Sequence, residues 1–261
     1  MSTIDKIMKL DTIFSLNDLE KIDSSKNNAK LTIREGILKG YISRIKRNLY
    51  AVNDLITNEP YANKFQIATR LSEDAIVSHI SAFHYHGIYN QVSYEMYYTT
   101  VAKNSPLVFE NIEYNPIKPR MHNFQLGVIE TKWDKVRVTD IERSLLDSVY
   151  DVSKIAGIDE IIEIISVLPN LNEDILLTYL KEYKGKIFFK RLGFLLSSFG
   201  NQEFSSNFWN TLQNKATGST QYLLPKSEFL IGETIKVSKW GLVVPKYIAR
   251  NQIKGKEQNE F

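Results

Sequence analysis

The stretch from Lys26 to Val52 constrains the fold of this chain more than any other, because charge, helical spacing and turn residues coincide in it. Up to Arg47 it holds seven basic residues and one acid, a net charge of +6, whereas the whole chain of 261 residues carries only +3. Asn27 and Asn28 favour a helix start, since their side chains accept hydrogen bonds from the first unpaired N–H groups. The apolar residues that follow recur at helical spacing and predict one buried face: Ala29, Ile33, Ile37 and Leu38, with Leu31 beside them.

A basic hairpin is predicted directly after this helix. Gly40 stands where a helix commonly ends, because glycine adopts the left-handed conformation of a C-terminal cap at little cost. Residues 41–45 and 49–52 are predicted as short strands, with a turn at 46–48 between them. A basic helix followed by a basic-tipped hairpin is typical of a winged helix-turn-helix, in which the helix enters the major groove. The alternative is a solvated surface hairpin that has no partner.

The residues around this stretch suggest where a DNA-binding domain begins and ends. The preceding residues predict a helix, a short strand and a second helix, which Ser15 and Asp18 open in the pattern of a capping box. The segment after the hairpin contains Pro60 and has little periodicity, so we place a domain boundary there. The predicted domains are a winged helix-turn-helix at 1–57 and a larger regulatory domain at 58–261.

The larger predicted domain has two parts. A period of two over 94–100, with shorter strand-like segments at 108–114, 124–130 and 135–138, predicts a small mixed or antiparallel sheet with helices in part 58–150. Part 151–261 is predicted to be mainly helical, because aliphatic residues recur there at helical spacing. The predicted fold class is therefore α+β.

Composition limits the chemistry that the chain can perform. It contains no cysteine, which excludes disulfides, zinc–thiolate sites and thiol nucleophiles. Its first residues, MSTIDKIMKLDTIF, include acids and no long apolar run, so no secretory signal is predicted. No run of about eighteen apolar residues predicts a membrane span. We expect a cytoplasmic protein that does not bind membranes.

Eight residues are predicted to contact double-stranded DNA. Lys30, Thr32 and Arg34 are expected to face the major groove from the helix, and the basic residues after them to bind phosphates or the neighbouring minor groove. Phosphate contacts supply affinity and base contacts supply specificity. If the protein neutralises four to six phosphates, the logarithm of the binding constant plotted against the logarithm of the salt concentration should have a slope of roughly −4 to −5 per protomer. We call this the log–log salt slope. The full predicted set is Asn28, Lys30, Thr32, Arg34, Lys39, Arg44, Lys46 and Arg47.

Three sequence patterns, in order along the chain, carry a family resemblance. They are RNLYA at 47–51, SHISA at 78–82 with His86 and Gly87 after it, and VTDIERSLLD at 138–147. Together they resemble the AbiEi antitoxins of bacterial abortive-infection toxin–antitoxin systems, over most of residues 10–150. Asn48 stands where the wing of that family usually has glycine, a replacement that asparagine tolerates because it adopts positive φ more readily than most residues. The helical part matches only loosely, through Arg191, Leu192 and Gly193.

The resemblance implies a function that the residues alone do not. It implies an antitoxin that binds inverted repeats in its own promoter, with monomers on paired repeats as one arrangement, and represses its operon. It also implies that the C-terminal region counteracts a nucleotidyltransferase toxin without a stable complex. No enzyme activity and no cofactor are implied.

Two other classes of function remain open from the residues. A ligand-responsive winged-helix regulator would have a closed apolar pocket with a few polar groups in its central domain. A metal-dependent nuclease would use the E-x-K pattern of Glu130 and Lys132 with Glu113 as the second carboxylate. Such triplets are common by chance in a charged sequence, and an exposed strand edge explains them equally well.

Further candidate catalytic or metal-binding groups are weaker. His79 and His86 are expected on one helix face with His84 elsewhere, so that the three do not converge on a metal ion. Asp140 is predicted to cap a helix, with Glu142 and Arg143 in surface or interdomain ion pairs. There is no Gly-rich phosphate loop, no G-x-S-x-G and no plausible Ser–His–Asp spacing, so no catalytic residues are predicted.

Overall fold

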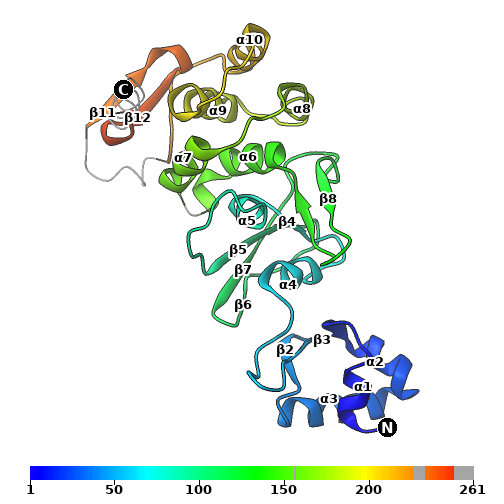
Figure 1. The fold of residues 1–261 in the computed structure, drawn as a ribbon. Helices are drawn as coiled ribbons and strands as arrows, with labels where there is room; N and C mark the ends of the chain where they lie inside the picture. The colour runs from blue at the N-terminus through cyan, green and yellow to red at the C-terminus, as the bar shows by residue number, and fades with distance from the viewer. Residues whose placement is uncertain (156, 226–232, 250–261) are drawn as a thin grey trace.

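The computed structural model describes residues 1–155, 157–225 and 233–249, so the end of the predicted helical part, 250–261, lies outside the described residues. Figure 1 shows three blocks in a row: an N-terminal block in blue, a central sheet in cyan and green, and a helical block that runs from light green through yellow to orange. The N-terminal block consists of α1 (Thr3–Ile7), β1 (Ile13–Ser15), α2 (Leu16–Asp23), α3 (Lys26–Leu38), β2 (Ile42–Lys46) and β3 (Leu49–Val52). Its antiparallel sheet has the strand order β1-β3-β2.

A serine side chain caps the N-terminus of each of the three helices in this block. Ser2 caps α1 and Ser15 caps α2, each in a capping box with an aspartate three residues on. For α3 the cap is Ser25, whose hydroxyl accepts a hydrogen bond from the backbone N–H of Asn28. The prediction that Asn27 and Asn28 cap this helix is therefore wrong, because the helix begins at Lys26.

The buried face of α3 is rotated from the predicted one. Its buried residues are Ala29, Thr32, Ile33 and Gly36, whereas Leu31, Ile37 and Leu38 are exposed. The cause is close packing: a Cβ at Gly36 would lie only 2.9 Å from Cδ1 of Ile7. Small residues on this side let α1 and β2 approach the helix, which turns the larger apolar side chains toward solvent.

The basic hairpin forms as predicted. β2 and β3 pair antiparallel around a turn at Arg47 and Asn48, with a register shift between Arg44 and Lys46. Asn48 has a φ of 61°, which asparagine tolerates better than most residues. Gly40, with a φ of 72°, follows α3 as predicted.

The central block is a six-stranded mixed sheet with helices beside it. Its elements are α4 (Lys64–Arg70), β4 (Ile76–Val77), α5 (Ile80–Tyr85), β5 (Glu95–Thr99), β6 (Leu107–Phe109), β7 (Ile112–Ile117), β8 (Val128–Glu130) and β9 (Arg137–Thr139). The strand order is β6-β7-β5-β4-β9-β8, with β5–β7 and β4–β9 parallel and the other pairs antiparallel. The single strand predicted at 108–114 is wrong, because Glu110 and Asn111 both have positive φ and form a hairpin turn.

The helical block holds the largest hydrophobic core of the described residues. It comprises α6 (Ile141–Tyr150), η1 (Val152–Lys154), α7 (Ile158–Val167), α8 (Glu173–Tyr179), α9 (Lys186–Phe199) and α10 (Ser206–Lys215), followed by β10 (Gln221–Tyr222), β11 (Thr234–Val237), η3 (Ser238–Trp240) and β12 (Leu242–Pro245). Within the part of the chain that the structure describes, none of the helices combines the length and the apolar character needed to cross a bilayer. The chain is α+β, as predicted.

One hydrophobic core joins the N-terminal block to the central sheet. Ile13, Ile45, Leu49 and Ala51 lie on the face of the small sheet that packs against α4, in the same cluster as Leu71 and other central residues. The opposite face, with Phe14, Ile42, Tyr50 and Val52, packs on the helices of its own block. The predicted boundary thus falls in a loop between two blocks that share buried apolar surface.

Candidate functional site

The outward surface of α3 carries three cations that pair with no acid in the described part of the chain. Lys26, Lys30 and Arg34 are exposed, and no ion pair joins any of them to another described residue. They follow one another at intervals of four residues, so they lie on one side of the helix. We call these three residues the basic face of α3. A surface of this kind attracts polyanions.

Two other predicted residues of α3 differ in exposure. Asn28 is exposed near the helix start. Thr32 is only 4% exposed, and its hydroxyl lies 3.5 Å from Nζ of Lys6, which donates to it. The expectation that Thr32 faces outward is wrong, because the helix turns this side chain toward α1.

Lys39 is engaged within its own helix. Its ammonium group lies 2.6 Å from the carboxylate of Glu35, one turn earlier. The hydrogen bond that Lys39 donates to Glu35 raises the pKa of Lys39 and lowers the pKa of Glu35. A phosphate would have to compete with Glu35 for this lysine, so Lys39 is a weaker candidate than the basic face.

The β2–β3 hairpin has two exposed arginines and one lysine that is bound within the protein. Arg44 and Arg47 are exposed, and Arg44 pairs in register with Tyr50, so it lies on the sheet face that covers the helices. Lys46 instead donates to the backbone carbonyl of Leu71 in the central block, and burial lowers its pKa. Lys46 therefore joins the β2–β3 hairpin to the central block, whereas the sequence predicts it as a phosphate contact.

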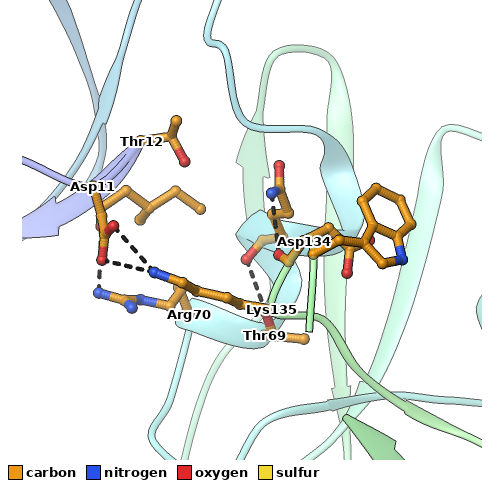
Figure 2. Close-up of a pocket in the computed structure, with 9 residues that line it drawn as sticks. Asp11, Thr12, Thr69, Arg70, Asp134 and Lys135 are labelled. Atoms are coloured by element: carbon orange, nitrogen blue, oxygen red, sulfur yellow. Dashed lines mark hydrogen bonds and ion pairs between the residues drawn. The ribbon is translucent and has the colours of Figure 1, made fainter. Parts of the chain in front are cut away.

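A cavity of about 240 Å³ lies where the N-terminal and central blocks meet. Figure 2 shows its polar lining, in which Nζ of Lys135 lies 3.2 Å from a carboxylate oxygen of Asp11. Arg70 donates to the carbonyl of Ile13 across the same junction, at 3.3 Å. These side chains bind one another, so the cavity differs from the closed apolar pocket expected of a ligand-responsive regulator.

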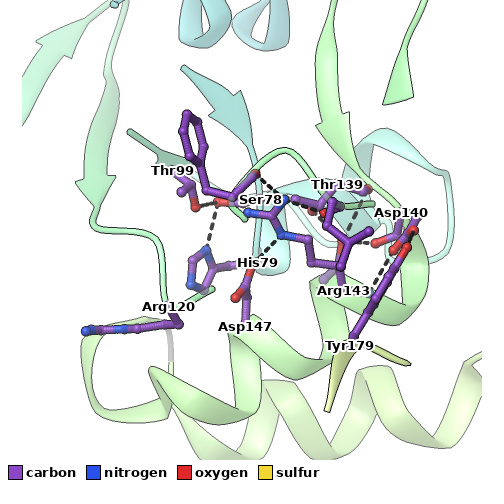
Figure 3. A network of polar contacts seen from close by, with 12 residues as sticks. Ser78, His79, Thr99, Arg120, Thr139, Asp140, Arg143, Asp147 and Tyr179 are labelled. Atoms are coloured by element: carbon purple, nitrogen blue, oxygen red, sulfur yellow. Dashed lines mark hydrogen bonds and ion pairs between the residues drawn. The ribbon is translucent and has the colours of Figure 1, made fainter. Parts of the chain in front are cut away.

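The segment 138–147, which carries part of the family resemblance, forms a buried polar network (Figure 3). Asp140 caps α6 as predicted and accepts a hydrogen bond from Tyr179 Oη at 2.6 Å, while burial raises its pKa. Arg143 is fully buried: its guanidinium donates to the carbonyls of Phe124 and Leu126 and pairs with Asp147. The prediction that Arg143 makes surface or interdomain ion pairs is therefore wrong, because its pair with Asp147 is buried and lies within α6.

A second group in this network was missed by sequence reasoning. Ser78 Oγ lies 2.8 Å from Nδ1 of His79, and Nε2 of His79 lies 3.6 Å from Asp151. His79 has a φ of 56° at the junction of β4 and α5, a strained conformation for a non-glycine residue. All three side chains are buried, and Asp151 also binds Arg120 in two hydrogen bonds. The group links the central sheet to the helical block.

The three histidines of the metal hypothesis have separate partners. His79 binds Ser78, while His86 Nε2 lies 2.8 Å from the carbonyl oxygen of Thr139. His84 is half-buried against Tyr89, and its pKa is lowered by burial. Among the described residues no group of three or more histidines, cysteines and acids is arranged to hold a metal ion.

The sheet order separates the acids of the nuclease hypothesis. Glu113 lies on β7 and Glu130 on β8, and three strands stand between these two in the sheet. With strands about 4.8 Å apart, the two carboxylates come from strands separated by roughly 19 Å. Glu130 and Lys132 are both exposed at the sheet edge. Glu113 therefore cannot serve as the second carboxylate of an E-x-K site.

Comparisons with known proteins give a fold but no function. No protein-family model and no curated protein matches the chain. Among solved structures, the crystal structure of the RV2827C protein from Mycobacterium tuberculosis is similar, with a TM-score of 0.67 and 13% sequence identity. The match covers 96% of this chain and 93% of that chain. At this identity the similarity supports the α+β fold over nearly the whole chain and nothing beyond it.

Proposed function

We propose that this chain is a winged-helix DNA-binding repressor that acts as the antitoxin of an AbiEi-type toxin–antitoxin pair. One observation carries the DNA-binding part: α3 presents Lys26, Lys30 and Arg34 on one side, and none of them pairs with an acid among the residues that the structure describes. The helix is followed by a hairpin with two exposed arginines, which is the layout of a recognition helix and its wing. The antitoxin part rests on the sequence resemblance.

The contact set of this proposal is smaller than the one predicted from the sequence. Lys30 and Arg34 are the candidates for base edges or phosphates of the major groove, and Arg44 and Arg47 for the flanking backbone. Asn28 and Lys26 supply contacts near the helix start. Thr32 and Lys46 are left out because their polar groups face the protein itself, and Lys39 because it pairs with Glu35.

A promoter-reporter assay tests the proposal directly. The full chain should repress a reporter placed behind the promoter of its own gene, and the double variant Lys30→Ala/Arg34→Ala should release repression by at least tenfold. The double variant Lys103→Ala/Lys132→Ala, which removes two exposed cations from the central block, is the matched control and should repress normally. Repression that survives the α3 variant would contradict the proposal.

The antitoxin part needs a separate measurement. Co-expression of a nucleotidyltransferase encoded next to this gene should arrest growth, and the full chain should restore it. The α3 variant should restore growth as well, since the proposal assigns neutralisation to the C-terminal region. Full-length variants are preferable to a fragment from residue 58, because that fragment would expose the buried face of α4 that the N-terminal sheet covers. Growth arrest that the full chain leaves unchanged would refute the antitoxin role.

A further inference from the structure

Two exposed leucines lie on the side of α3 that points away from the protein. Leu31 is 63% exposed and Leu38 is 77% exposed. Together with Asn27 and Arg34 they occupy positions i, i+4, i+7 and i+11, which form one stripe along a helix. This stripe, called here the outer stripe, lies opposite the buried residues Ala29, Thr32, Ile33 and Gly36.

A single exposed leucine needs no explanation, but the surroundings of this pair do indicate a partner. Arg34 stands between the two leucines, and Lys30 is beside them on the basic face. The partner must therefore offer apolar groups within a negatively charged surface. The DNA major groove meets both conditions, because thymine projects its C5-methyl group there between two rows of phosphates.

The spacing of the leucines sets the spacing of their targets. Seven residues of α-helix span about 10.5 Å, at a rise of 1.5 Å per residue. Three base-pair steps of B-DNA span about 10 Å, at 3.4 Å per step along each strand. A helix that lies along the groove thus brings Leu31 and Leu38 to bases about three steps apart.

We propose that Leu31 and Leu38 read thymine methyl groups, so that the operator carries thymines about three base steps apart. Arg34, between the leucines, binds the intervening base edge or phosphate. This inference rests on the proposed DNA-binding function and adds the residues and the base that give it sequence specificity.

Deoxyuridine substitution tests the inference, because it removes the C5-methyl group and leaves base pairing intact. Duplexes selected by the full-length protein from a random pool provide the probe, and each thymine is replaced in turn while affinity is measured. Replacement at two positions should weaken binding of the unmodified protein about three- to fourfold each, the value of one buried methyl group. The Leu31→Ala protein should lose the effect at one of these positions and Leu38→Ala at the other.

Met8→Ala is the matched control, since Met8 is also an exposed apolar residue of the N-terminal block, at 50% exposure. It should keep both effects. The inference is overturned if selected duplexes bind equally well with deoxyuridine at every position, or if both effects persist in the leucine variants. Failure to select any duplex would instead refute the proposed function, so the two failures are distinguishable.

Discussion

Nε of Arg143 lies 3.2 Å from Oδ2 of Asp147, one turn along α6, and both side chains are buried. Asp147 also accepts a hydrogen bond from Tyr183 Oη at 2.7 Å, while Arg143 binds the carbonyls of Phe124 and Leu126. The hydrogen bonds of this pair therefore hold α6 against Phe124 and Leu126, which precede β8, and against Tyr183, which follows α8.

Replacing Asp147 with alanine should destabilise the protein strongly. The change leaves the Arg143 guanidinium buried without its counter-charge, which costs about 3–5 kcal/mol in comparable buried pairs. Urea denaturation of the purified proteins measures this cost. Glu130→Ala, which removes an exposed acid at the edge of the central sheet, should change the unfolding free energy by less than about 0.5 kcal/mol. Equal effects of the two substitutions would contradict the role assigned to the buried pair.

Asp151 should make the free energy of unfolding fall as the solution becomes acidic. Burial raises the pKa of Asp151, but the nearby His79 ring and the hydrogen bonds from Arg120 outweigh it and leave the pKa below the ordinary 3.8. A lowered folded-state pKa stabilises the protein above the unfolded-state value, and this contribution is lost as the pH falls. Between pH 7 and pH 3 the loss from this residue is about 1 kcal/mol.

The unfolding free energy of the Asp151→Asn protein should accordingly fall by about 1 kcal/mol less than that of the unmodified protein between these pH values. Glu130→Gln, at an exposed position, serves as the control and should keep the original pH dependence. If all three proteins lose the same stability on acidification, Asp151 does not carry this effect.

The N-terminal block and the central sheet should unfold together. Ile45 is only 4% exposed and lies in the core that the two blocks share. Ile45→Ala should therefore lower the free energy of unfolding by about 2–5 kcal/mol. It should also lower the temperature of the single unfolding transition of the two blocks. Leu38→Ala removes an exposed side chain and should change stability by less than about 0.5 kcal/mol. Two separate thermal transitions, with only one shifted by Ile45→Ala, would be inconsistent with a shared core.

The three basic residues of the β2–β3 hairpin, Arg44, Lys46 and Arg47, should differ in their effect on DNA binding. Arg44→Ala and Arg47→Ala should each make the log–log salt slope shallower by about 1, because each arginine is assigned one phosphate. Lys46→Ala should leave the slope nearly unchanged, since its ammonium group donates to the carbonyl of Leu71. Fluorescence anisotropy with a labelled duplex at several salt concentrations measures all three. A slope change for Lys46→Ala as large as for the arginines would show that the carbonyl contact is lost on binding.

Local patterns in the sequence were sufficient for the N-terminal cap of α2 and for the basic hairpin, although not for the cap of α3. Ser15 with Asp18, Gly40 after the helix, and the turn near Asn48 depend only on near neighbours, and the structure confirms each of them. The α+β class followed from the same kind of pattern. That the predicted residues contact DNA remains a prediction.

Features that depend on distant neighbours could not be predicted. The rotation of α3 arises because Ile7 approaches Gly36, and no helical spacing rule contains that contact. Likewise, Asp151 joins His79 only once the sheet and the helical block pack together. Lys46 looked like a phosphate contact because its charge is visible in the sequence, whereas the carbonyl of Leu71 that binds it is not.

The dependence of duplex affinity on salt tests the central claim most directly, because it counts the phosphates that the protein neutralises. For the full-length protein on a selected duplex we expect a log–log slope of roughly −4 to −5, which Lys30→Ala/Arg34→Ala makes shallower by about 2. A slope near zero, or one that this double variant leaves unchanged, would contradict the claim that the basic face of α3 binds DNA.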